Sequence, residues 1–303
     1  MASRAELEKQ VRELNKTTGL QIEVTAESQE EITFALQQTR QLLGAYKEKY
    51  DKNYFLRSLM TGKIQGAEID AYAKKLHIPY EEKRVLFLIE TKSTVDDFML
   101  ELLKNLFPAQ GKNYIVKMDY HQIVLLRPSE EPKEHVYEES MSIAHAIIDT
   151  VNAEAMSSVR VSFGRRMNEL SDALESFTDV QMAMRIGNIF YSEQLVIPYN
   201  RLGTGGLLYQ VPRNHCEAFL REVFCDELPA ELDEELQMTV KKFFQYNLNI
   251  AETSRQLHMH RNTLIYRIEQ LQKRTGLDIR IFEDACVFRI AMMVMNDLKI
   301  QDK

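Results

Sequence analysis

The residue types best suited to recognition chemistry gather in one short stretch near the carboxyl end, between residues 249 and 276. The side chains that we expect to carry the function are His260, Arg261, Asn262, Thr263, Tyr266 and Arg267. Arginine binds guanine or phosphate, asparagine binds adenine, and threonine contacts a thymine methyl group or a phosphate. This set favours binding to double-stranded DNA.

The same stretch is basic, although the whole chain is acidic. From residue 254 to residue 276 there are five basic residues and one acidic residue, whereas the 303-residue chain has a formal net charge of −7. A local positive surface is what neutralisation of DNA phosphates requires. The alternative is an ordinary solvated pair of helices whose arginines have no ligand.

Two short helices are needed to position these side chains. Asn249 suits a helix N-cap, and Glu252 three residues later completes the pattern of a capping box. The first helix has the inward row Ile250, Ser254 and Leu257, and the second has the row Leu264, Ile268 and Leu271. His258 and Met259 interrupt the register between the two rows, and Gly276 suits the end of the second helix. The pattern predicts two helices joined by a brief turn.

Other residues that could do chemistry lack the partners that chemistry needs. His258 and His260 have no third metal ligand nearby, and Cys216, Cys225 and Cys286 form no C-x-x-C pair, so we expect reduced thiols and no metal. The glycine cluster at residues 203–206 has no following Lys-Ser/Thr, so we interpret it as a linker and not as a phosphate loop. We predict no catalysis and no cofactor.

A long helical pattern covers residues 30–59. Its apolar residues recur at steps of three and four and include Ile32, Leu36, Leu43, Tyr46, Tyr50 and Tyr54. The stripe either packs within its own domain or forms the seam of a dimer, and the imperfect heptads leave both interpretations open.

Residues 83–198 alternate between strand-like and helix-like segments. The order is strand, helix, hairpin, helix, strand, helix, strand, with the apolar run at residues 85–89 typical of a strand buried on both faces. This order predicts an α/β sandwich, a sheet covered by helices.

The chain as a whole is expected to be α+β and mainly helical. We expect an N-terminal helical or dimerisation region at 1–79, the α/β domain at 80–200, a helical linker at 201–230 and an all-α helix-turn-helix domain at 231–303. The hydrophobic fraction of 45% and charged fraction of 27% exclude disorder. No apolar run resembles a secretory signal or reaches the length of a membrane span, so we expect a cytoplasmic protein.

At the carboxyl end the chain resembles a known family. Residues 252–268 read Glu-Thr-Ser-Arg-Gln-Leu-His-Met-His-Arg-Asn-Thr-Leu-Ile-Tyr-Arg-Ile, and together with Thr275-Gly-Leu-Asp they closely resemble the helix-turn-helix of the PucR family, which includes the carbohydrate diacid regulators. Ser254 stands where that family usually has alanine. Residues 55–62 resemble the family's helix that leads into a central domain, and the strand order resembles a degenerate GGDEF-like domain.

The resemblance implies a sequence-specific transcription regulator, often an activator that responds to a metabolite. It also implies no cyclase activity, because the hairpin Met118-Asp119-Tyr120-His121 lacks the glycines and paired carboxylates of active diguanylate cyclases. The expected partners are promoter DNA, a second copy of the chain in a homodimer or higher oligomer, and a small-molecule effector, but no membrane. The alternative function is a nucleotide-binding signalling protein that acts through the central domain.

Overall fold

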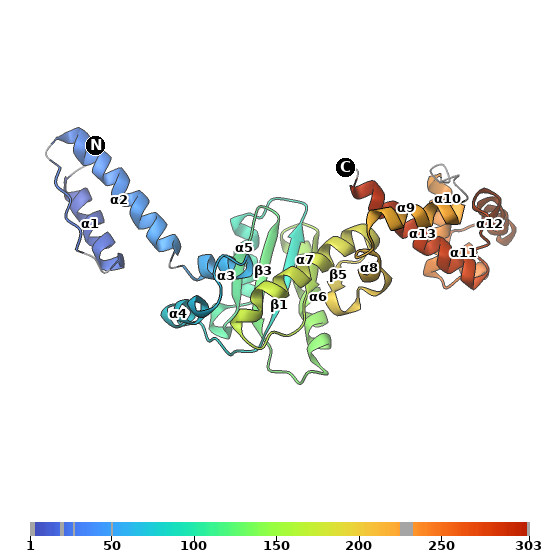
Figure 1. Ribbon diagram of the computed structural model, residues 1–303, viewed down its shortest axis with the longest axis horizontal. Helices are drawn as coiled ribbons and strands as arrows, with labels where there is room; N and C mark the ends of the chain where they lie inside the picture. The colour runs from blue at the N-terminus through green and yellow to red at the C-terminus, as the bar shows by residue number, and fades with distance from the viewer. Residues whose placement is uncertain (1–3, 19–20, 27, 50, 225–232, 302–303) are drawn as a thin grey trace. The chain divides into compact units, whose positions relative to one another are not determined.

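The computed structural model describes residues 4–18, 21–26, 28–49, 51–224 and 233–301 (Figure 1). The chain separates into two compact units, which are described one at a time. The first contains residues 1–184 and 194–201, and the second contains residues 185–193 and 202–303.

The first unit begins with two helices, α1 (Arg4–Thr18) and α2 (Gln29–Lys49). They pack on each other through a small apolar cluster that contains Leu7, Ile32 and Leu36. Packing within this helix pair therefore accounts for the first part of the stripe seen in the sequence. The expectation of one helix over residues 30–59 was wrong, because α2 ends at Lys49 and α3 (Lys52–Met60) has its own N-cap, Asp51, whose side chain accepts a hydrogen bond from Asn53 N.

A five-stranded sheet in the order β2-β3-β1-β4-β5 forms the centre of this unit. The strands are β1 (Arg84–Thr91), β2 (Tyr114–Lys117), β3 (Gln122–Pro128), β4 (Val159–Phe163) and β5 (Val196–Pro198). Phe87 in the central strand is opposite Leu125 of β3 and Phe163 of β4, both antiparallel neighbours, and only β4 and β5 are parallel. The predicted hairpin and the doubly buried strand are both confirmed.

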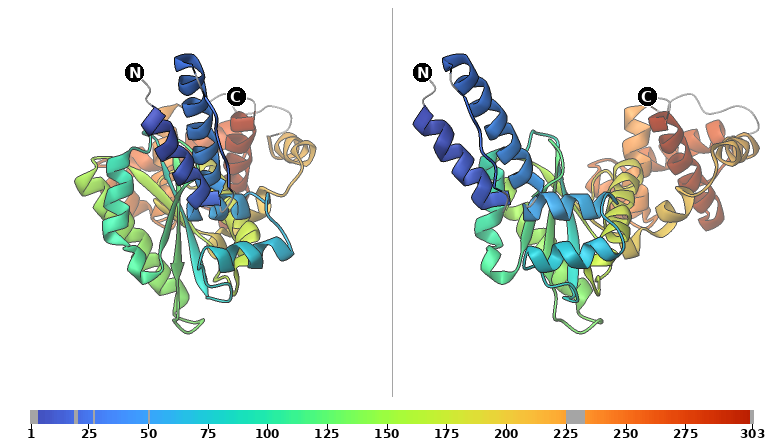
Figure 2. Two further views of the ribbon diagram at one scale, coloured as in Figure 1. Left: turned by 90° about the vertical axis from the view of Figure 1, so that its left-hand side faces the viewer. Right: turned by 60° about the vertical axis from the view of Figure 1, so that its left-hand side comes forward.

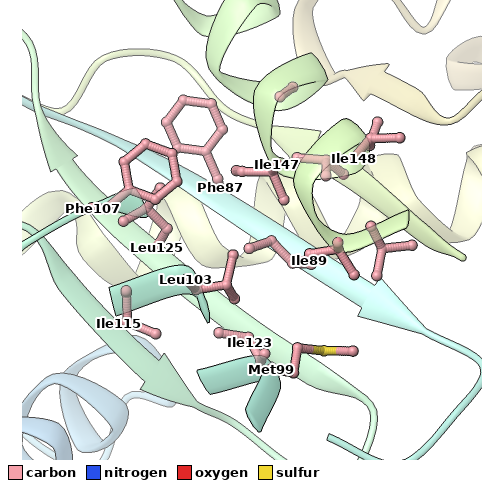
Figure 3. Close-up of a cluster of buried hydrophobic side chains, with 14 of the residues drawn as sticks. Phe87, Ile89, Met99, Leu103, Phe107, Ile115, Ile123, Leu125, Ile147 and Ile148 are labelled. Atoms are coloured by element: carbon pink, nitrogen blue, oxygen red, sulfur yellow. The ribbon is translucent and has the colours of Figure 1, made fainter. Parts of the chain in front are cut away.

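Helices cover both faces of the sheet (Figure 2). On one face α5 (Asp97–Leu106) and α6 (Val136–Glu154) bury residues such as Met99, Leu103 and Ile147 against Phe87 and Ile89 (Figure 3). Against the other face lies α7 (Ala173–Phe190), where Ser162 Oγ of β4 donates a hydrogen bond to Val180 O. Helix α4 (Ala67–Lys75) is joined to α3 by stacking of Tyr72 on Phe55. The predicted α/β sandwich is confirmed.

The second unit is helical. It contains α8 (Gly203–Leu208), α9 (Arg213–Phe224), α10 (Glu234–Gln245), α11 (Ile250–Gln256), α12 (Arg261–Thr275) and α13 (Phe282–Gln301). One apolar cluster joins α10, α12 and α13 through residues such as Phe243, Ile268 and Phe288, and another joins α9 to α13 through Leu220 and Val294. In the described part of the chain no helix is long and apolar enough to cross a bilayer.

Residues 203–206, which the sequence predicts to be part of a helical linker, begin helix α8. Gly205 N donates a hydrogen bond to Tyr191 Oη, and a Cβ atom on Gly205 would lie 3.0 Å from the rings of Phe190 and Tyr191. Glycine is required here because two aromatic rings approach the backbone. The segment 201–230, predicted to be helical, contains α8 and α9, and its end, with Cys225, falls outside the described residues.

Candidate nucleic-acid interface

Helices α11 and α12 form the predicted helix-turn-helix. Asn249 Oδ1 accepts a hydrogen bond from Glu252 N at 3.0 Å and so caps α11. The reciprocal half of the capping box is replaced, since the Glu252 carboxylate pairs with Arg255 and accepts from Gln256. Between the helices His258 has φ +51°, a left-handed conformation that reverses the chain within a few residues.

The inward face of α12 is fixed by apolar packing. Leu264, Ile268 and Leu271 are fully buried, in a cluster with Leu236 and Phe243 of α10. Burial of three large side chains at steps of four and three sets the rotation of α12 about its own axis. It thereby decides which side chains the helix presents to solvent.

The first turns of α12 present four of the predicted site residues to solvent. These exposed residues are Arg261, Asn262, Thr263 and Tyr266. Tyr266 is 60% exposed, so its ring and its hydroxyl group are both accessible to a ligand. The structure therefore brings these four side chains together on one accessible surface, which we call the α12 outer face.

His260 lies at the start of this face and is the N-cap of α12. Its Nδ1 accepts a hydrogen bond from Asn262 N at 3.2 Å. The ring thus satisfies one of the free amides at the helix terminus, which carries a partial positive charge. His260 is also exposed, so its other ring nitrogen remains available to a ligand.

Arg267 lies differently from the other predicted residues. Its side chain is only 25% exposed, with Nη1 donating to Thr239 Oγ1 at 3.1 Å and Nη2 lying 2.8 Å from Glu235 Oε2. Both partners belong to α10. The guanidinium that the sequence placed among the base-reading groups is therefore directed toward a neighbouring helix.

Other basic residues within this segment and just after it are also engaged. Arg274 Nη1 lies 3.5 Å from Asp233 Oδ2, and Arg280 pairs with Asp278 at 2.7 Å. The hydrogen bonds from Arg280 lower the pKa of the Asp278 carboxyl. Arg261 and Lys273 are exposed and form no ion pair within the described residues, so they contribute unneutralised positive charge to the surface of α12.

Sequence reasoning did not identify Glu235, Thr239 and Asp278 as partners of these arginines. Glu235 and Arg267 are 32 residues apart, and each residue type is common on helix surfaces. No periodic pattern marks such a pair. The close spacing of Asp278 and Arg280 was the one local signal that could have indicated an ion pair.

The turn of the hairpin between β2 and β3 is closed by the side chain of Asp119. Asp119 Oδ1 accepts hydrogen bonds from His121 N at 2.7 Å and from Gln122 N at 2.8 Å, so the carboxylate closes the turn between β2 and β3. No group of three potential metal-ligating residues occurs among the described side chains. Asp119 therefore has a structural role in this turn.

Comparisons with known proteins find two separate domains in the chain. A model of the PucR C-terminal helix-turn-helix domain matches residues 236–294, and a model of the GGDEF-like domain matches residues 61–186. The first match covers α11 and α12 with the helix on each side of them. The chain is thus a helix-turn-helix protein that also carries a GGDEF-like domain.

Three curated relatives show the same similarity. The chain is 37% identical over 79 residues to the protein YxkF of Bacillus subtilis, covering 26% of each chain. It is 24% identical over 247 residues to the carbohydrate diacid regulator of Escherichia coli, covering 78% of this chain and 64% of the relative. It is 23% identical over 147 residues to the purine catabolism regulatory protein of B. subtilis, covering 48% and 28%. In each case the aligned part is less than two thirds of the relative's length. With both domain matches, these similarities show that the chain resembles proteins of the PucR family.

Proposed function

We propose that this protein is a sequence-specific DNA-binding transcription regulator that acts without catalysis. The observation that carries the proposal is the α12 outer face, where Arg261, Asn262, Thr263 and Tyr266 project from the first turns of the second helix of a helix-turn-helix. Recognition helices enter the major groove with their N-terminal residues toward the bases. Two relatives are named as regulators, which supports the same proposal.

Each exposed side chain has a role that follows from its chemistry. Arg261 can bind guanine or a phosphate, Asn262 can bind adenine through two hydrogen bonds, and Thr263 can contact a thymine methyl group or a phosphate. Tyr266 offers an apolar ring and a hydroxyl group to the groove. His260, at the helix N-terminus, contacts phosphate in this arrangement.

Arg267 takes a different role in the proposal. Its hydrogen bonds to Glu235 and Thr239 connect α12 to α10. In the proposal Arg267 therefore orients the recognition helix, whereas the exposed side chains of α12 contact the bases. Loss of such a positioning residue weakens binding to every DNA sequence, whereas loss of a base-reading residue changes the preference among sequences.

The proposal includes a homodimer or higher oligomer in the cytoplasm. Two copies related by a twofold axis present two recognition helices to half-sites about 34 Å apart on one face of the duplex. Regulation by a metabolite, activation of transcription and a dimerising role for residues 1–79 belong to the same proposal. For the alternative, nucleotide signalling through the central domain, the use of Asp119 within its own turn offers no support.

Selection of bound fragments from the source genome with purified protein would identify the DNA target. Fluorescence anisotropy on a selected fragment should then show that Arg261→Ala and Tyr266→Ala each weaken binding by at least about tenfold, a loss of about 1.4 kcal/mol. Arg221→Ala is the matched control, because Arg221 is an exposed residue of α9 and the change in charge is the same. Wild-type affinity in both α12 variants would exclude the outer face as the DNA-binding surface.

A further inference from the structure

The segment between α1 and α2, residues 21–26, has the features of a β-strand that lacks a sheet. Ile22, Val24 and Ala26 are partly or fully buried, whereas Gln21, Glu23 and Thr25 are exposed. This strict alternation is typical of an extended chain with one face packed. In Figure 1 the segment runs back along the helices, so that α1 and α2 point in the same direction.

The reach of the segment also indicates an extended chain. Residues from Ile22 to Ala26 line a groove of about 390 Å³ together with α1 residues from Arg4 to Arg12. Eight steps of helix rise about 12 Å, and four steps of strand span about 13 Å. Residues 22–26 can line the same groove as the eight-step stretch of α1 only if they are nearly fully extended.

One edge of this strand is occupied by α1. The Asn15 side chain donates to Ile22 O at 2.9 Å and accepts from Ile22 N at 3.0 Å, so it pairs with the backbone of Ile22 as a neighbouring strand would. In an extended chain the backbone groups of alternate residues point to opposite edges. The backbone groups of Glu23 and Thr25 therefore point to the edge away from Asn15.

That second edge has no partner within the described chain. The backbone N–H and C=O groups of Glu23 and Thr25 form no hydrogen bond with any described residue. An unpaired strand edge is a template for addition of another strand. The exposed Phe34 (64%) and Leu42 (57%) of α2 are further apolar surface on the same helix pair.

We propose that this edge pairs with the same segment of a second copy, giving a two-stranded antiparallel ribbon on a twofold axis. The register places Val24 opposite the partner's Val24 and Glu23 opposite the partner's Thr25. A register centred on residue 23 would set two glutamates against each other, a destabilising arrangement that the proposed register avoids. Each Glu23–Thr25 pair exchanges both of its backbone hydrogen bonds. The interface is self-complementary, as a twofold contact must be.

This inference names the surface that makes the proposed dimer, and it is testable without DNA. Paired residues of this kind have Cα atoms about 5.5 Å apart, which a disulfide bond can span. Under mild oxidation, a mixture of full-length Glu23→Cys and Thr25→Cys chains should form more cross-linked heterodimer than either variant alone forms homodimer. The parent chain is the control for Cys216, Cys225 and Cys286. Cross-linking in the mixture that does not exceed that of the single variants would overturn the register.

Sedimentation of the full chain provides a second test. Thr25→Pro removes an N–H group that forms no hydrogen bond within the described chain. Proline also restricts the residue before it to an extended conformation, and Val24 lies in an extended segment, so the substitution is compatible with the fold. Its fold should therefore be unchanged by circular dichroism, while the dimer dissociation constant rises at least about tenfold. Thr25→Val retains the N–H and should dimerise like the wild type. If Thr25→Pro dimerises as tightly as Thr25→Val, the strand edge is not the interface.

Arg261→Ala should remain dimeric even where DNA binding is lost, so failure of this inference and failure of the proposed function can be distinguished.

Discussion

Arg267 of α12 and Glu235 of α10 lie 2.8 Å apart, Nη2 to Oε2, and join the recognition helix to the helix that precedes the helix-turn-helix. The same guanidinium reaches Thr239 Oγ1 one turn further along α10. A single arginine therefore bonds two successive turns of the supporting helix. Its position is set by contacts within the protein before any DNA is present.

Replacement of Arg267 by alanine should lower the free energy of unfolding of the second unit by about 1–2 kcal/mol, because two hydrogen bonds from a charged donor are lost. Glu235→Gln should cost less than about 1 kcal/mol, since the Glu235 side chain is 78% exposed and solvent screens the pair. Urea unfolding followed by circular dichroism measures both. Equal stability of the alanine variant and the wild type would show that the contact does not hold α12.

Replacement of a phosphate-binding residue and of a base-reading residue on α12 should change the salt dependence of DNA binding differently. Lys273→Ala should weaken binding equally on all duplexes and reduce the slope of log K against log salt by about 1, as expected when one phosphate contact is lost. Asn262→Ala should leave the slope unchanged and cost about 1–3 kcal/mol on the selected site, with preference relaxed at one A·T pair. Anisotropy titrations at several salt concentrations, on the selected duplex and its single-base variants, separate these outcomes. The same salt slope for both variants would contradict the assignment.

Gly205 should not tolerate a methyl group. Gly205→Ala places a Cβ atom 3.0 Å from the rings of Phe190 and Tyr191, and Tyr191 Oη also donates to Leu202 O, so the ring is held in place. Overpacking of this kind costs about 1–3 kcal/mol. Gly44→Ala in α2 is the matched control, because no atom lies within 4 Å of the added Cβ atom and alanine favours the helix. Thermal unfolding should show a lower Tm for Gly205→Ala and an unchanged or higher Tm for Gly44→Ala.

The Asp278–Arg280 pair should make stability depend on pH in the acid range. Hydrogen bonds from Arg280 lower the pKa of Asp278 in the folded state, so the folded state binds this proton less readily than the unfolded state does. The stabilisation is fully present above the unfolded pKa of about 3.9 and is lost as the pH falls through the lower, folded pKa. Asp278→Asn should be less stable than the wild type at pH 6, and the difference should shrink below about pH 4. Urea unfolding at both pH values tests this, and a difference independent of pH would contradict it.

Much of the fold was predictable because its signals are local. The positions of the β2–β3 hairpin, strand β4 and the N-cap Asn249 follow from alternation, apolar runs and capping chemistry within a few residues. The row Leu264, Ile268 and Leu271 likewise specified which face of α12 is buried. Side chains on the opposite face, such as Asn262 and Tyr266, are exposed for the same reason.

Other features depended on the tertiary structure. Periodicity could not show that α2 ends before a separate α3, because the apolar stripe continues across Asp51. Nor could composition reveal that aromatic rings approach the backbone at Gly205.

By itself, the sequence determined the periodic pattern of α11 and α12, their caps and the exposed side chains of the recognition helix, since each depends on neighbours within about two turns. Only the tertiary structure decided that Arg267 is directed toward α10, because Glu235 and Thr239 come close through packing of helices distant in sequence. It also showed that the backbone groups of Glu23 and Thr25 have no hydrogen-bond partner among the described residues. Hydrogen-bond partners of this kind are set by distances in space, which no spacing along the chain encodes.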